Sequence, residues 1–144
     1  MTDPIASLEH DHLHLSKLVA DVRRLLGPAE ESDRDQLVWA LTALRDDLFD
    51  HFGREEESLF PYLRTALPDL SGPLAELEAA HDRICGGVSR MLAALERAPQ
   101  LHALFTRFDA EYGAHAGRES ELLRSLAGRL DEAQRAAVAA MLRN

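Results

Sequence analysis

The sequence predicts an all-α protein, an antiparallel up-down-up-down four-helix bundle with a short C-terminal fifth helix. Apolar residues recur at steps of three and four through most of the chain, which is the spacing of one face of an α-helix. Short connections containing proline or glycine separate four long segments of this kind. No run alternates apolar and polar residues as a half-buried strand does. The 144 residues suit one domain, and we expect residues 1–144 to form a single one.

The first two expected helices are bounded by proline, glycine and capping residues. The first ends at Gly27–Pro28, and Ser32 or Asp33 can cap the second, which ends at Pro68. Pro61 falls inside the second pattern, so we expect a kink or a loosened last turn there. The inward face of the first helix comprises Ile5, Leu8, His12, Leu15, Val19, Val22 and Leu26. That of the second comprises Leu37, Leu41, Leu44, Leu48, His51, Glu55, Ser58 and Tyr62.

The third and fourth expected helices follow the same pattern. Ser71 can cap the third and Pro73 suits its first turn, while Gly86–Gly87 either weakens it or permits a close approach by a neighbouring helix. The chain turns again near Pro99. The inward face of the third helix comprises Leu74, Leu77, His81, Ile84, Val88, Met91 and Leu95. That of the fourth comprises Leu101, Leu104, Phe108, Tyr112 or Glu111, His115, Glu119, Leu122 and Leu126.

A short fifth helix is expected at the C-terminal end. Gly128 is a suitable end for the fourth helix. Asp131–Gln134 resembles a capping box with aspartate in the place of serine or threonine, and an alanine-rich segment follows it.

Composition excludes several classes of function. The formal net charge is -9, and Lys17 is the single lysine, so neither nucleic acid nor an anionic membrane is an expected partner. No apolar run is long enough to span a bilayer, and no secretory signal is visible. With Cys85 as the single cysteine, an internal disulfide is impossible, and we expect a cytoplasmic protein.

Each of the four apolar faces is interrupted by a histidine, and two of them also by a glutamate four residues later. The six groups are His12, His51, Glu55, His81, His115 and Glu119. Burying such groups without partners costs several kcal/mol, and a pair of dications offsets this cost. At ~1.5 Å per residue, all six lie roughly 12–20 Å from one end of an antiparallel bundle, hence in one layer. The sequence therefore predicts a metal site in the core.

The first helix offers three candidate histidines. Only His12 falls on the apolar face, so we select it, with His10 as the alternative and His14 on a flanking face.

Among the remaining residues, Cys85 is expected to be a small buried residue directed toward the site, with thiolate ligation as the less favoured alternative. Trp39 is expected to pack at the core or its edge. Other polar residues have secondary expectations: Tyr62 and Tyr112 could donate hydrogen bonds near the ligands but are more commonly packing residues, and Glu56 and Glu57 should form a solvated edge.

The run His51–Pro61, HFGREEESLFP, resembles the HFxxEE…LFP signature of the hemerythrin and HHE cation-binding family. The similarity extends over residues 4–127 and includes the histidines of the first and third helices and the His115–Glu119 pair. It implies a non-haem di-iron site in which Glu55 and Glu119 bridge the two metals and the histidines are terminal ligands. The choice of iron as the expected metal rests chiefly on this resemblance, because imidazole and carboxylate ligands also suit manganese and zinc.

The sequence also departs from the oxygen-carrying hemerythrins. Those proteins have a second histidine four residues after the first in the third helix, where this chain has Cys85, and a more widely spaced aspartate in place of Glu119. A site with one imidazole fewer leaves room for water, peroxide or nitric oxide. We therefore expect a protein that binds or senses dioxygen, nitric oxide, peroxide or iron. The alternative is a di-iron enzyme that dismutates peroxide or reduces nitric oxide.

Overall fold

The computed structural model describes residues 4–27 and 34–142, which confirm the all-α class and contain no strand. The α-helices are α1 (Pro4–Leu25), α2 (Arg34–Arg54), α3 (Phe60–Ala66), α4 (Ser71–Ala93), α5 (Ala98–Arg129) and α6 (Glu132–Leu142). A π-helix, η1 (Glu55–Leu59), joins α2 to α3, and a 3-10 turn, η2 (Pro68–Leu70), precedes α4. The expected cap at Ser32 or Asp33 lies outside the described residues.

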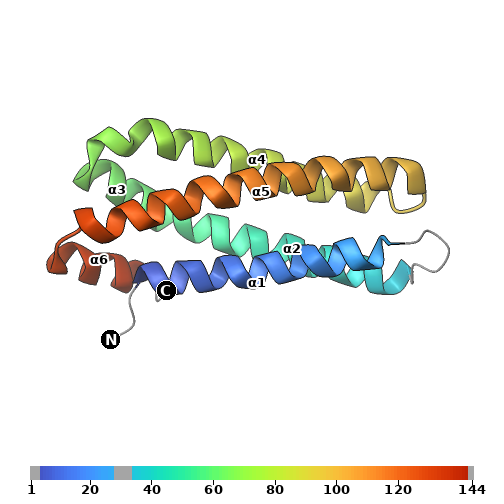
Figure 1. Cartoon of the computed structure of the whole chain (residues 1–144), viewed down its shortest axis with the longest axis horizontal. Coiled ribbons are helices and arrows are strands. Elements are labelled where there is room, and N and C mark those ends of the chain that lie inside the picture. The colour runs from blue at the N-terminus through green and yellow to red at the C-terminus, as the bar shows by residue number, and fades with distance from the viewer. Residues whose placement is uncertain (1–3, 28–33, 143–144) are drawn as a thin grey trace.

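The long helices form a bundle. Figure 1 shows α1, α2, α4 and α5 lying lengthwise beside one another, with α6 at one end. Contacts join α1 to α2, α2 to α4, α4 to α5 and α5 back to α1, while α6 rests on η1 and α1. No helix within the described ranges is long and apolar enough to cross a membrane.

A polar layer divides the apolar core into two clusters. The large cluster contains buried residues from Leu15 to Tyr112, drawn from α1, α2, α4 and α5. The small cluster contains Leu8, Leu59, Phe60, Leu63, Leu70, Leu74, Leu77, Leu123, Leu126, Leu130 and Val138. Along each long helix the predicted site residues fall between a member of one cluster and a member of the other. The helical period of the sequence therefore places the site between the two apolar clusters.

The predicted inward face of the second segment is wrong after Glu55, because a π-helical turn begins there. The Phe60 N–H donates to the Glu55 carbonyl, and Leu59 and Leu63 are 1% and 0% exposed. Ser58 and Tyr62, which a regular helix would direct inward, are only half-buried. The physical reason is that a π-turn inserts an extra residue and so rotates the face that follows. Pro61 suits this geometry, because a regular α-helix would bring its ring against a carbonyl of the preceding turn.

Three other expectations about helix faces are refined. Phe105 and Leu123 are buried on α5, whereas the predicted Leu104 and Leu122 are half-buried, as is Leu95 beyond α4. Adjacent residues point about 100° apart around a helix, so either of two neighbours can border a wide apolar face, and periodicity alone does not decide which one is buried. Tyr112 rather than Glu111 is the buried alternative on α5.

Helix ends and the paired glycines give mixed outcomes. The Ser71 cap is wrong, because Ser71 is already the first helical residue of α4 and no side chain caps that end. The capping box before α6 is confirmed: the Asp131 N–H donates to Gln134 Oε1 at 2.9 Å, and the Gln134 N–H donates to Asp131 Oδ1 at 2.8 Å. Gly87 permits a close approach, since a Cβ there would lie 3.3 Å from Phe108 Cδ2.

Because of the π-turn, we expect truncation of Leu63 to destabilise the protein more than truncation of Tyr62, the opposite of what a regular helix would give. We expect Leu63→Ala to lower the free energy of unfolding by about 2–5 kcal/mol, the cost of emptying a fully buried leucine site. Tyr62→Ala should cost less, because Tyr62 is half-buried. Urea denaturation of the two variants measures both costs. A larger loss at Tyr62 would mean that the helix is regular through Pro61.

Candidate metal centre

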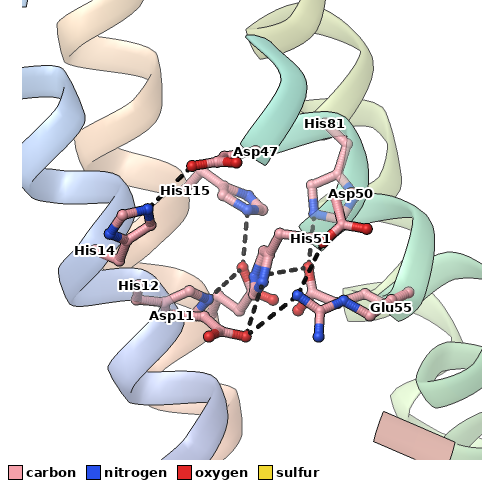
Figure 2. A network of polar contacts seen from close by, with 11 residues as sticks. Asp11, His12, His14, Asp47, Asp50, His51, Glu55, His81 and His115 are labelled. Carbon is pink, nitrogen blue, oxygen red and sulfur yellow. Dashed lines mark hydrogen bonds and ion pairs between the residues drawn. The ribbon is translucent and has the colours of Figure 1, made fainter. Parts of the chain in front are cut away.

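Six side chains from the four long helical segments meet in the polar layer. His12 comes from α1, His51 and Glu55 from α2 and the start of η1, His81 from α4, and His115 and Glu119 from α5. Figure 2 shows the side chains of His12, His51, Glu55, His81 and His115 converging between the helices. These are the six residues that periodicity selected, and the structure brings them together.

Each carboxylate lies between two imidazoles from different helices. Glu119 Oε2 is 2.9 Å from His115 Nε2 and 3.3 Å from His12 Nε2. Glu55 Oε1 is 3.4 Å from His51 Nε2 and 3.5 Å from His81 Nε2. All four imidazoles thus present Nε2 to a carboxylate oxygen.

The ligand atoms form two overlapping groups, each with all its atoms within 4.8 Å of one another. One group contains His12, His51, Glu55 and Glu119, and the other contains His81, His115 and Glu119. Glu119 belongs to both. The arrangement offers two neighbouring positions for cations, with a shared carboxylate between them.

The polar atoms of this layer are buried without hydrogen-bond partners. Glu55 and Glu119 are 0% and 1% exposed, and the His12 side chain is the most exposed of the six at 11%. Each of the six contributes at least one buried atom with no hydrogen bond, and within the described ranges Arg54 Nε is the single such atom elsewhere. Buried polar atoms are nearly always satisfied in native proteins, so their concentration here points to a site that binds metal ions.

The short contacts in this layer are not hydrogen bonds. His115 Nε2 lies 2.9 Å from Glu119 Oε2, yet the angles do not allow a hydrogen bond. Two ligand atoms that bind one metal ion at about 2.1 Å, roughly at right angles, lie about 3 Å apart. The nitrogen–oxygen distances of 2.9 to 3.5 Å therefore fit a set of donors that converges on cations.

Burial keeps His51, His81 and His115 neutral. Burial, reinforced by the other histidines and by Arg54, lowers the pKa of His51 from 6.5 to about 3. Burial and the same histidine cluster lower the pKa of His81 to about 2. Burial, then His12 and two arginines, lowers the pKa of His115 to about 4. A neutral imidazole has a free lone pair, which is the form that binds a metal ion.

Two further carboxylates approach the outer nitrogens of the imidazoles. Asp11 Oδ2 lies 3.7 Å from His51 Nδ1, and Glu56 Oε2 lies 3.7 Å from His81 Nδ1. Carboxylates in this position orient metal-binding histidines in many proteins. Glu56 is therefore half-buried beside the site rather than on a solvated edge, and burial raises its pKa. Sequence reasoning missed both residues, because each approaches a histidine of another helix.

Phe52 covers one side of the layer. Its ring stacks on His81 with centroids 3.7 Å apart and an interplanar angle of 9°, and it meets His115 edge-on at 5.5 Å. Phe52 is 3% exposed and belongs to the large cluster. The phenylalanine that follows His51 therefore separates the polar layer from the apolar core.

The remaining histidines lie outside the layer. His14 is exposed and lies 3.0 Å from Asp47, and His10 and His102 are also exposed. The structure thus favours His12 over His10 as the contribution of α1.

Cys85, the two tyrosines and Trp39 lie outside the two groups of ligand atoms. Cys85 is half-buried against the large cluster and belongs to neither group of ligand atoms. Burial, then Asp82 and Glu56, raises the pKa of its thiol to about 11. Tyr112 packs in the large cluster and Tyr62 against the small one. The expected packing of Trp39 is wrong, because this side chain is 72% exposed on α2; periodicity had not placed it on an inward face.

The bundle and its buried histidines and glutamates define a metal-binding helical protein. A family model described as the hemerythrin HHE cation binding domain matches residues 3–132. The chain belongs to this family, and the resemblance seen in the sequence is confirmed. Neither a curated protein nor a solved structure matched the chain.

The buried neutral histidines predict a pH-dependent stability. Because the folded pKa of His81 lies below 6.5, the unfolded chain binds a proton that the folded chain does not. The free energy of unfolding of chelator-treated protein should therefore fall as the pH drops below about 6.5, by up to about 1.4 kcal/mol per pH unit for this residue. Denaturation at pH 7, 6 and 5 measures the slope, which should be smaller in His81→Gln. Parallel curves for the two proteins would contradict a neutral, buried His81.

Proposed function

We propose that this protein holds two iron ions between its six site residues and binds or senses a small ligand there: dioxygen, nitric oxide, peroxide, or iron itself. The observation that carries the proposal is the set of buried imidazole and carboxylate atoms without hydrogen-bond partners. A pair of cations would compensate both buried carboxylates. Iron rests on family membership, and manganese or zinc would suit the same donors.

The bridging role falls to the two glutamates. Glu119 is supported by its presence in both groups of ligand atoms, and Glu55 by its position between His51 and His81. The histidines would then be terminal ligands through Nε2, with Asp11 and Glu56 3.7 Å from the outer nitrogens of His51 and His81. When bound, the metal pair supplies Lewis-acid and redox chemistry to a small ligand. Phe52 limits water on one side of the layer.

The ligand count supports uptake of an external ligand. Four histidines and two carboxylates are one imidazole short of the oxygen-carrying set, and Cys85, at the position of the absent histidine, lies outside both groups. An incomplete ligand set leaves a coordination position for a small molecule. The alternative is an enzyme that dismutates peroxide or reduces nitric oxide. Binding is favoured because the further carboxylates that approach the site, Asp11 and Glu56, face the outer nitrogens of the rings, and neither is directed to the metal-binding nitrogens as an acid or base would be.

The proposal also covers the architecture and the location. We take residues 1–144 as one domain with an antiparallel up-down-up-down bundle, which the alternating course of the coloured helices in Figure 1 supports. A cytoplasmic location is supported by the single cysteine of the chain.

Metal analysis tests the proposal. Freshly purified protein should contain about two metal ions per chain, because the site offers two groups of ligand atoms. His51→Ala should lose most of this metal, whereas His10→Ala and His102→Ala, at exposed positions, should retain it. Elemental analysis of the four proteins measures the contents.

Two results would change the conclusion. Equal loss in all three variants, or no metal in the unaltered protein after incubation with Fe(II), would contradict the site. Sustained oxygen evolution from hydrogen peroxide by the iron-loaded protein would favour the enzyme over the binding protein.

A further inference from the structure

A hollow of about 250 Å³ lies between α4 and α5 and reaches the metal centre at His115. Small side chains leave this space: Ala80 on α4, and Ala110 and Ala114 on α5. At His51, by contrast, the cavity beside the site measures about 10 Å³, which is room for roughly one water molecule. The wall at His115 is therefore the more open approach to the polar layer.

Two arginines line this hollow. Arg83 on α4 and Arg118 on α5 are exposed, and neither forms an ion pair or a side-chain hydrogen bond with any residue in the described ranges. Both lie close enough to His115 to help lower its pKa. Glu111 also lines the hollow, but its carboxylate lies 3.7 Å from Arg107 Nε, which offsets its charge. The hollow is thus locally positive in a chain of net charge -9.

We propose that this hollow binds a small oxyanion between Arg83 and Arg118, next to His115, and that anionic ligands approach the metal centre here. The second part rests on the function proposed above. Guanidinium groups present two parallel N–H donors that match the geometry of an oxyanion such as nitrite or a carboxylate. Because most of the chain repels anions, a local pair of unpaired cations determines where an anion approaches.

The chain contains a matched comparison site. A second hollow, of about 360 Å³, lies at the end of α4 and the start of α5, and it is also lined by two arginines, Arg90 and Arg97. None of its lining residues belongs to the metal centre. Removing its two charges changes the net charge of the protein by the same amount as removing Arg83 and Arg118.

Nitrite titration of the metal-free and the zinc-loaded protein tests the proposal. We expect saturable shifts of the Arg83 and Arg118 side-chain N–H signals in ¹H–¹⁵N spectra, with much smaller shifts at Arg90 and Arg97. The affinity for nitrite should fall about tenfold in the double variant Arg83→Gln/Arg118→Gln, and with rising salt, because the attraction is between partly exposed charges. The double variant Arg90→Gln/Arg97→Gln should bind as the unaltered protein does.

The outcomes separate the two proposals. Absence of saturable shifts at Arg83 and Arg118, or equal weakening in both double variants, would overturn the anion site. Metal content, measured on the same samples, tests the metal centre independently. If the protein shows the shifts but takes up no metal, the anion site stands and the proposed metal-binding function is overturned. If it takes up metal without the shifts, the metal centre stands and the anion site is overturned.

Discussion

Glu55 and Glu119 lie in the middle of an apolar bundle, almost without exposure, and the groups nearest to them are imidazoles. Burial keeps those of His51, His81 and His115 neutral. A buried carboxylate without compensation costs several kcal/mol, which is a large part of the stability of a domain this size. Arg54 does not supply the missing charge, because its guanidinium is directed to Asp50 and Asp11. Bound cations beside the two carboxylates would meet this requirement.

The helices are built around this layer. Each long segment carries apolar residues on both sides of its site residue, so that one cluster packs above the layer and the other below it. The π-turn that starts at Glu55 adjusts the second segment. It leaves Glu55 facing the site and brings Leu59 and Leu63 into the small cluster, where a regular helix would place Ser58 and Tyr62. Phe52 packs between the polar layer and the large cluster. On the side of His115, small alanine side chains leave a hollow that reaches the layer.

Helical periodicity predicted much of this arrangement. It selected His12 from three neighbouring histidines, and it placed all six groups at one height, because a fixed rise per residue converts sequence position into depth. It failed at the π-turn before Pro61, where the chain departs from a regular helix. It also failed at the edges of apolar faces, where either of two adjacent residues, such as Leu104 and Phe105, can border the core.

Other features depend on contacts between helices that sequence spacing does not describe. Asp11 approaches His51 across the α1–α2 interface, and Glu56 reaches His81 from another helix. The exposure of Trp39 and the packing of Cys85 against the large cluster, outside both groups of ligand atoms, likewise follow from which neighbours are present rather than from residue type.

The most direct test of a cation pair in this layer is X-ray diffraction from crystals grown with Fe(II), with data collected on both sides of the iron absorption edge. The account predicts two anomalous peaks inside the bundle, adjacent to the Glu55 and Glu119 carboxylates. Peaks confined to the molecular surface, or an iron-free interior with both glutamates turned outward, would contradict it.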